Sequence, residues 1–161
     1  METSIGIEIA ASPRRVYDLA AQLPRWPELL PHYRYVTVES QRGSRIVASM
    51  GARRPGRLPI PVRWRAEHWS DDSDAADLRL YFAHVGGATK GMRVVWHIRP
   101  CAVGALVRID HSFERRLPLL AADLFPRLVD ALFVRPIAGR TLATFKAVSY
   151  THLTLPTILL V

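Results

Sequence analysis

The chain has 161 residues, of which 49% are hydrophobic, and it carries a formal net charge of +8. This length suits one domain with a buried core, and the composition excludes a disordered chain. Cys101 is the only cysteine, which excludes an internal disulfide or a thiolate metal cluster and predicts a reducing, cytoplasmic location. The first residues lack the features of a secretory signal, and the apolar runs are too short to span a bilayer.

The positive charge comes almost wholly from arginine, which supplies 20 of the 22 basic residues. Such a balance is compatible with nucleic acid, an acidic membrane surface or an anionic partner. The arginines are scattered through an Ala- and Pro-rich chain, as GC-rich codon usage would produce, so nucleic-acid binding is not favoured. They are densest over Ala52–Arg65, which is either a solvated loop or a basic surface for an acidic carrier protein or a phosphate-bearing headgroup.

The N-terminal residues predict one strand followed by two short helices. Ile5, Ile7 and Ile9 alternate with polar or small residues, which is the period of a strand. Ser12 is a good N-cap, Pro13 suits the first helical position, and the apolar residues that follow recur at helical spacing. The proline-bounded stretch RWPELLPH has room for only one or two further turns.

The middle of the chain predicts six strands joined by short turns, which make an antiparallel meander. Each stretch alternates apolar with polar residues, and turn-forming residues separate the stretches. The predicted strands are residues 33–40, 44–52, 61–69, 76–85, 91–100 and 105–115.

The C-terminal third predicts one long helix, from about Leu119 to Ala147, with a kink at Pro136. A helical wheel places several apolar side chains on one face, namely Phe125, Leu128, Val129, Leu132, Phe133 and Ala143. A large open sheet must cover one of its faces, and only this helix is long enough to do so. The fold class is therefore α+β.

This order of elements resembles the START-like (Bet v 1-like) superfamily, and within it bacterial polyketide cyclase/dehydrase and coenzyme-Q-binding-type proteins. The resemblance is carried by SPRRVYDLAAQLPRWPELLPHYRYVTV and FVRPIAGRTLATFKA, and it extends from Ser4 to about Ala147. It implies a helix-grip fold, in which a curved seven-stranded antiparallel sheet wraps the C-terminal helix around a cavity. Members of the superfamily use that cavity for lipids, quinones or reactive polyketide chains.

Strand alternation predicts which side chains face the helix. Trp64, Phe82 and Trp96 would form flat apolar walls, as core packing or as ligand contacts. His68, His84 and His111 fall on the same otherwise apolar face. A single inward histidine is commonly a hydrogen-bonded core residue, but three of them indicate a polar element in a cavity.

Histidine titrates near neutral pH, so proton transfer is the chemical role that these residues suit best. Enolising a β-keto chain needs a base, and expelling water afterwards needs an acid. The predicted catalytic residues are therefore His84 and His111, with His68 in the cavity wall. No HxH or HxxxH pair supports a metal site, and the expected chemistry needs no cofactor.

Four further residues complete the predicted cavity. Tyr33 and Tyr35 could polarise a carbonyl group if they point inward, although the phase of their strand is ambiguous. Phe133 lies on the apolar helical face. Arg140 is either a surface arginine in the late turns of the helix or a cation at the cavity mouth.

Three functions follow as hypotheses. The first is a cofactor-independent polyketide cyclase/aromatase or dehydratase, which would receive its substrate from an acyl carrier protein. The second is a non-catalytic carrier of a lipid or quinone. The third is a basic module that docks on RNA or a ribosome.

The last residues, VSYTHLTLPTILLV, differ in character from the rest because they carry no charge. They resemble the translation of a transposon adapter used in short-read library preparation. We therefore expect a ligand-binding domain over residues 1–147 and a non-native tail over residues 148–161.

Overall fold

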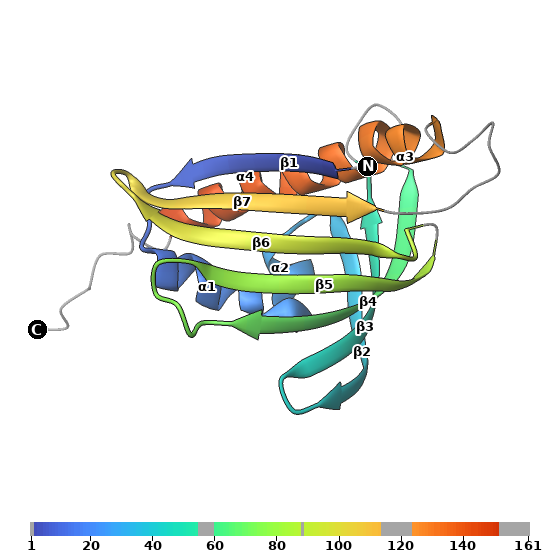
Figure 1. The fold of residues 1–161 in the computed structure, drawn as a ribbon, viewed down its shortest axis with the longest axis horizontal. Helices are drawn as coiled ribbons and strands as arrows, with labels where there is room; N and C mark the ends of the chain where they lie inside the picture. The colour runs from blue at the N-terminus through green and yellow to red at the C-terminus, as the bar shows by residue number, and fades with distance from the viewer. Residues whose placement is uncertain (1, 55–59, 88, 114–123, 152–161) are drawn as a thin grey trace, which may run out of the picture.

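The computed structural model describes residues 2–54, 60–87, 89–113 and 124–151. Seven strands form one antiparallel sheet in the order β1-β7-β6-β5-β4-β3-β2. The helices lie together against one face of this sheet (Figure 1). The strands are β1 Glu2–Ile9, β2 Tyr33–Arg42, β3 Arg45–Arg53, β4 Pro61–Asp71, β5 Leu78–Gly87, β6 Met92–Cys101 and β7 Gly104–Phe113.

The two predicted short helices are confirmed, with a 3-10 turn between them. Helix α1 covers Pro13–Ala21, η1 covers Leu23–Arg25 and α2 covers Trp26–Leu29. The Ser12 side chain accepts a hydrogen bond from the Arg15 amide, which caps α1. The Trp26 indole N–H donates to the Ala20 carbonyl at 3.0 Å, so α2 is tied to α1 with its large ring in the core.

The long C-terminal helix is present, but a π turn divides it. Helix α3 covers Leu124–Val129, η2 covers Asp130–Val134 and α4 covers Arg135–Thr151. The Arg135 amide donates to the Asp130 carbonyl, the wide spacing of a π turn. Pro136, which has no amide N–H to donate, follows at once. The predicted start near Leu119 lies outside the described residues.

The predicted buried face of this helix was wrong in part. Leu128, Leu132 and Ala143 are exposed. The buried apolar residues of the described part of this helix include a step of five positions across η2, and they are Val129, Val134, Ala138, Leu142 and Phe145. A π turn contains an extra residue, so it rotates the later turns relative to the earlier ones and breaks a simple helical wheel.

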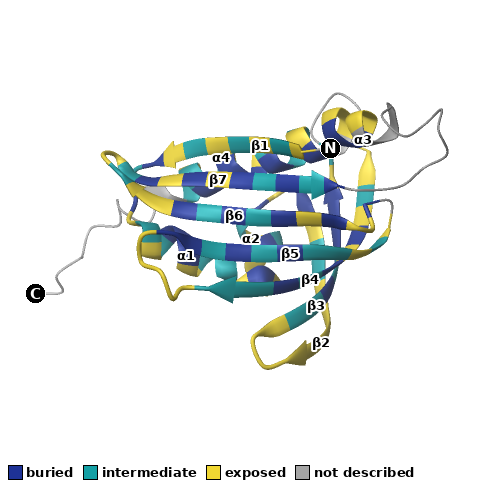
Figure 2. Ribbon diagram, viewed as in Figure 1, coloured by how far each residue is buried: buried dark blue, intermediate teal, exposed yellow. Residues whose placement is uncertain are grey.

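The alternation predicted for the strands is confirmed. Buried residues alternate with more exposed ones along the central strands, as Figure 2 shows. Trp64, Phe82, Trp96 and His111 all lie on the buried face, which packs against α1, α2 and α4. The arrangement is the predicted helix-grip fold. The candidate site lies in the space between the sheet and the helices.

The C-terminal part of the chain offers no test of the predicted domain boundary. Helix α4 continues to Thr151, four residues past the predicted end of the domain, and the rest of the tail lies outside the described residues. Within the described residues, no helix is both long enough and apolar enough to cross a membrane.

Candidate functional site

Two adjoining cavities lie between the sheet and the helices, with volumes of about 70 Å³ and 60 Å³. Trp64 and His84 line both of them. The first cavity is also lined by Trp26, Tyr33, Met50, Phe82, Val94 and Trp96. The second is also lined by Val62, Thr89, Met92, Val134 and Ile137. Each has room for a few water molecules, so a larger ligand would have to displace side chains.

Aromatic rings form the walls of the first cavity. The Trp26 ring centroid lies 5.1 Å from that of Tyr33, 5.7 Å from that of Phe82 and 5.7 Å from that of Trp96. Trp64 closes the opposite side, with its centroid 5.8 Å from that of Tyr33. Flat rings from α2 and four strands thus surround a narrow space, a shape suited to a planar apolar molecule.

His84 is the titratable side chain shared by the two cavities. Its ring stacks on Trp64 with 6.1 Å between centroids, and its Nδ1 lies 2.7 Å from the Thr89 hydroxyl oxygen. Burial lowers the pKa of His84 to about 3, and the nearby His111 acts in the same direction. The imidazole is therefore neutral at pH 7.

His111 lies on the buried face but does not line either cavity with His84. It pairs with Val94 and Thr3 across the sheet, and it is 8% exposed. It borders a separate hollow at the β1–β7 edge, with Glu2, Thr3, Ser4 and Asp110. Its Nδ1 is buried and has no hydrogen-bond partner among the residues that the structure describes, and burial lowers the pKa of His111 to about 4.

His68 is packed in the core and lines neither cavity. It is 2% exposed, its Nδ1 lies 3.1 Å from the Tyr81 carbonyl oxygen, and its ring stacks on Phe82 at 4.6 Å. Burial lowers its pKa to about 4. His68 Nδ1 is already hydrogen bonded to the backbone, and the side chain lines neither cavity. The structure therefore does not support the predicted place of His68 in the cavity wall.

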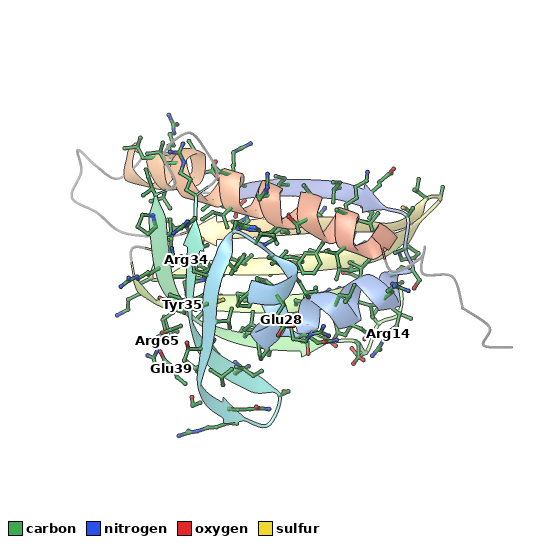
Figure 3. The ribbon with its side chains drawn as sticks, turned by 180° about the vertical axis from the view of Figure 1, so that it is seen from behind. Arg14, Glu28, Arg34, Tyr35, Glu39 and Arg65 are labelled. Carbon is green, nitrogen blue, oxygen red and sulfur yellow. The ribbon has the colours of Figure 1, made fainter. Side chains whose placement is uncertain are left out.

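The two tyrosines of β2 point to opposite faces of the sheet. Tyr33 pairs with Ala52 and lines the first cavity, whereas Tyr35 pairs with Gly51 after a register shift. The Tyr35 ring covers Gly51 so closely that a side chain there would overlap it. Tyr35 lies near Arg65 and Glu39 (Figure 3). Tyr35 is therefore corrected to an outer-face residue, because the bulge at Arg34 shifts the strand by one position.

Of the two helix residues predicted for the cavity, neither is shown to line it. Arg140 is exposed on α4, and the side chain of Phe133 lies outside what the structure describes. The lining residues that the sequence did not single out include Trp26, Met50 and Thr89. The size and apolar surface of the Trp26 ring were a usable signal, because tryptophan is highly buried on average.

The outer face of the sheet carries cations that are matched with carboxylates. Arg45 contacts Glu67 at 3.1 Å, Arg108 contacts Asp110 at 2.9 Å, and Arg65 contacts Glu39. Arg79 and Arg99 both contact Asp77, at 2.7 Å and 3.0 Å. In the described part of the chain, no group of three or more His, Cys, Asp or Glu residues is arranged to hold a metal ion.

Comparisons with known proteins agree with this geometry. The family model described as polyketide cyclase/dehydrase and lipid transport matches residues 9–135. No curated protein matches the sequence significantly.

Among solved structures, the protein TTHA0849 from Thermus thermophilus is 23% identical with a TM-score of 0.75, covering 94% of this chain and 99% of that one. The ZhuI aromatase/cyclase from Streptomyces sp. R1128 is 12% identical with a TM-score of 0.77, covering 95% of each chain. A START superfamily protein from Mycobacterium smegmatis is 13% identical with a TM-score of 0.65, covering 91% and 98%. At these identities the likeness shows a shared fold.

Proposed function

The chain belongs to the polyketide cyclase/dehydrase and lipid transport family, and from this premise we propose that it binds a planar, hydrophobic small molecule between the sheet and α4. The observation that carries the proposal is the ring of aromatic side chains around the first cavity, with His84 as its titratable group. Apolar walls with a few polar groups are the usual composition of a small-molecule site.

Within that role, we propose cyclisation and dehydration of a poly-β-ketone chain as the chemistry. Neutral His84 would take a proton from the carbon between two carbonyl groups, and the resulting enolate carbon would form a bond to a distant carbonyl carbon. The alkoxide formed there would take the proton back from His84 and become a hydroxyl group. A second proton would then pass from the neighbouring carbon to His84 and from His84 to that hydroxyl group, which would leave as water as the carbon–carbon double bond forms. Histidine can serve both as the base and, once protonated, as the acid.

A carrier without catalysis is the second candidate, and the pKa of His84 favours it. A general base works best when its pKa lies near the working pH, whereas burial holds the pKa of His84 at about 3. Proton transfer would require a bound substrate to raise that pKa. A carrier of a quinone or lipid requires only the aromatic walls.

The remaining partner proposals concern the surface. If the cyclase function holds, an acyl carrier protein would deliver the poly-β-ketone substrate to the cavity. A nucleic-acid role is not proposed, because several outer-face arginines, among them Arg45, Arg65, Arg79 and Arg108, are paired with carboxylates.

The two candidates can be separated by comparing binding with turnover. Quenching of tryptophan fluorescence by 2-naphthol reports binding, since Trp26, Trp64 and Trp96 line the cavity. Conversion of a linear poly-β-ketone N-acetylcysteamine thioester, followed by mass spectrometry, reports turnover. His84→Gln is expected to reduce turnover about 100-fold or more while 2-naphthol affinity changes less than threefold.

His68→Gln is the matched control, because this buried histidine lies outside the cavities and should leave both readouts unchanged. Binding without turnover in the wild-type protein would favour the carrier. If 2-naphthol does not quench the wild-type protein, the proposed cavity function is wrong.

A further inference from the structure

Two inward histidines of the sheet have hydrogen-bond partners of different kinds. His68 Nδ1 lies 3.1 Å from the Tyr81 carbonyl oxygen, whereas His84 Nδ1 lies 2.7 Å from the Thr89 hydroxyl oxygen. A carbonyl oxygen can only accept, so it requires a hydrogen on Nδ1 of His68. A hydroxyl group can donate or accept, so it is compatible with either neutral tautomer of His84. The tautomer is therefore fixed in His68 and open in His84.

The turn between β5 and β6 holds Thr89 against His84. The Gly91 amide donates to the His84 carbonyl at 2.8 Å, and the Met92 amide donates to the Thr89 carbonyl at 3.0 Å. Thr89 is 8% exposed and lines the second cavity together with His84. These backbone bonds fix the hydroxyl oxygen beside Nδ1, while its hydrogen can rotate. When the oxygen accepts from Nδ1–H, that hydrogen can turn toward the second cavity, which has room for a water molecule.

Nε2 is the ring nitrogen that His84 offers to a ligand. His84 lines both cavities, and its Nε2 has no hydrogen-bond partner in the part of the chain that the structure describes. Burial holds the pKa of His84 at about 3, so the ring is neutral at pH 7 and has one N–H. Where Thr89 donates to Nδ1, Nε2–H is a donor toward the cavity. Where Thr89 accepts from Nδ1–H, Nε2 is an acceptor.

From this arrangement we propose that the His84–Thr89 pair is an adaptable polar group, which lets the cavity bind planar rings that carry either a hydrogen-bond acceptor or a hydrogen-bond donor. The ligand class that fits is a ring compound that exists in a carbonyl form and a hydroxyl form, since Nε2 can donate to the first and accept from the second. The proposal rests on the proposed function, because it specifies the ligand of the same cavity. His84 contacts the ligand, and Thr89 is a positioning residue that acts through His84.

The test compares three two-ring probes by equilibrium dialysis at pH 7.5. Indole offers only an N–H donor, quinoline offers only a nitrogen acceptor, and naphthalene offers neither. In the wild-type protein, Nδ1 of His84 stays hydrogen bonded to Thr89 in both polar complexes. We therefore expect the dissociation constants of indole and quinoline to lie within about fivefold of each other.

Thr89→Val removes the hydroxyl group and keeps the volume of the side chain nearly unchanged. An indole complex would then leave Nδ1–H of His84 buried and unpaired, whereas a quinoline complex would leave only a lone pair unpaired. We expect indole to lose about tenfold in affinity relative to quinoline. Thr89→Ser keeps a hydroxyl group and should keep the wild-type ratio. Naphthalene affinity should stay within about threefold in both variants, which separates a change of polarity from damage to the cavity.

Nitrogen-15 NMR of the imidazole rings reads the position of the hydrogen directly. We expect His84 to carry it on Nε2 in the quinoline complex and on Nδ1 in the indole complex. His68 is the internal control, because the Tyr81 carbonyl should hold its hydrogen on Nδ1 in both complexes.

The same His84 tautomer in both complexes would overturn the inference and leave the proposed function standing. An unchanged ratio of indole to quinoline affinity in Thr89→Val, with naphthalene still bound, would overturn it too, as would a wild-type preference of more than about fivefold for either probe. If none of the three probes bound to the wild-type protein, the cavity function itself would fail, and the inference would fail with it.

Discussion

The two faces of the sheet differ in how completely their buried polar groups are hydrogen bonded. On the outer face, Asp77 is 6% exposed and receives hydrogen bonds from Arg79, Arg99 and His97. On the inner side, His32 and His111 each have a buried ring nitrogen with no hydrogen-bond partner in the described part of the chain. Unsatisfied buried polar groups reduce the stability of a fold. The outer face therefore pairs its buried carboxylate with several donors, whereas the inner side leaves two imidazole nitrogens unpaired among the described residues.

The largest expected effect is acid destabilisation caused by the interior histidines. Burial lowers the pKa of His32, His68 and His111 to about 4 and that of His84 to about 3. An unfolded histidine titrates near 6.5, so below that pH the unfolded chain binds more protons than the folded one. Stability should therefore fall as pH drops from about 6.5 toward 4. At pH 5.5 the loss should be roughly 1 kcal/mol for each histidine.

Urea unfolding at pH 7.5, 6.5 and 5.5 measures this loss. The four histidines together would remove several kcal/mol, much of the stability of an ordinary domain. His68→Gln removes one titrating group and should flatten the pH dependence by about a quarter. If the urea midpoint did not change between pH 7.5 and 5.5, protonation of the interior histidines would not reduce the free energy of unfolding, and the prediction would be wrong.

The next effect concerns the outer face, where Asp77→Ala should destabilise the protein by about 2–3 kcal/mol, since it leaves two guanidinium groups without their buried carboxylate. The Arg99, Arg79 and His97 hydrogen bonds hold the pKa of Asp77 below its usual range against the opposing effect of burial. Its contribution is complete above about pH 4 and declines as the pH falls further.

Urea midpoints at pH 7.5 measure the change, and Asp110→Ala is the matched control. Asp110 is 34% exposed, so its loss should remove less than about 1 kcal/mol. Equal losses in the two variants would show that burial of the outer-face carboxylate does not matter. Any change in 2-naphthol binding would show that the two faces are coupled.

The smallest effect is expected at the aromatic pair of the outer face. The Arg45 guanidinium lies 4.4 Å from the centre of the Trp69 ring, which stacks on Tyr81 at 5.2 Å. Arg45→Ala should reduce stability by about 0.5–1 kcal/mol, because the guanidinium is half exposed. Arg45→Lys should lose less, since it keeps the charge. Thermal unfolding followed by circular dichroism measures both, and a loss above about 2 kcal/mol would contradict a solvated pair.

Local pattern was enough to predict most of the fold and part of the site. Strand alternation predicted the face that Trp64, Phe82, Trp96 and His84 share, because successive side chains along a strand point to opposite faces. The helix-grip arrangement followed from the order of elements. The role of each histidine did not follow, since His68 and His84 have the same local pattern but different partners.

Other features of the fold and of the site depend on packing between segments that lie far apart in the sequence. A bulge at Arg34 sent Tyr35 to the outer face, and the π turn at Asp130–Val134 moved the buried face of the helix. Both are single-residue insertions in a periodic element, and they are stabilised by packing against other elements, so periodicity alone cannot locate them. The Thr141 hydroxyl and His32 lie 109 residues apart, and their hydrogen bond exists only because α4 crosses the end of α2. The sequence alone therefore determined which residues of the central strands face inward, because strand alternation has a fixed geometry. Tertiary packing decided the outward position of Tyr35, the buried face of the long helix and the hydrogen-bond partner of each inward polar group.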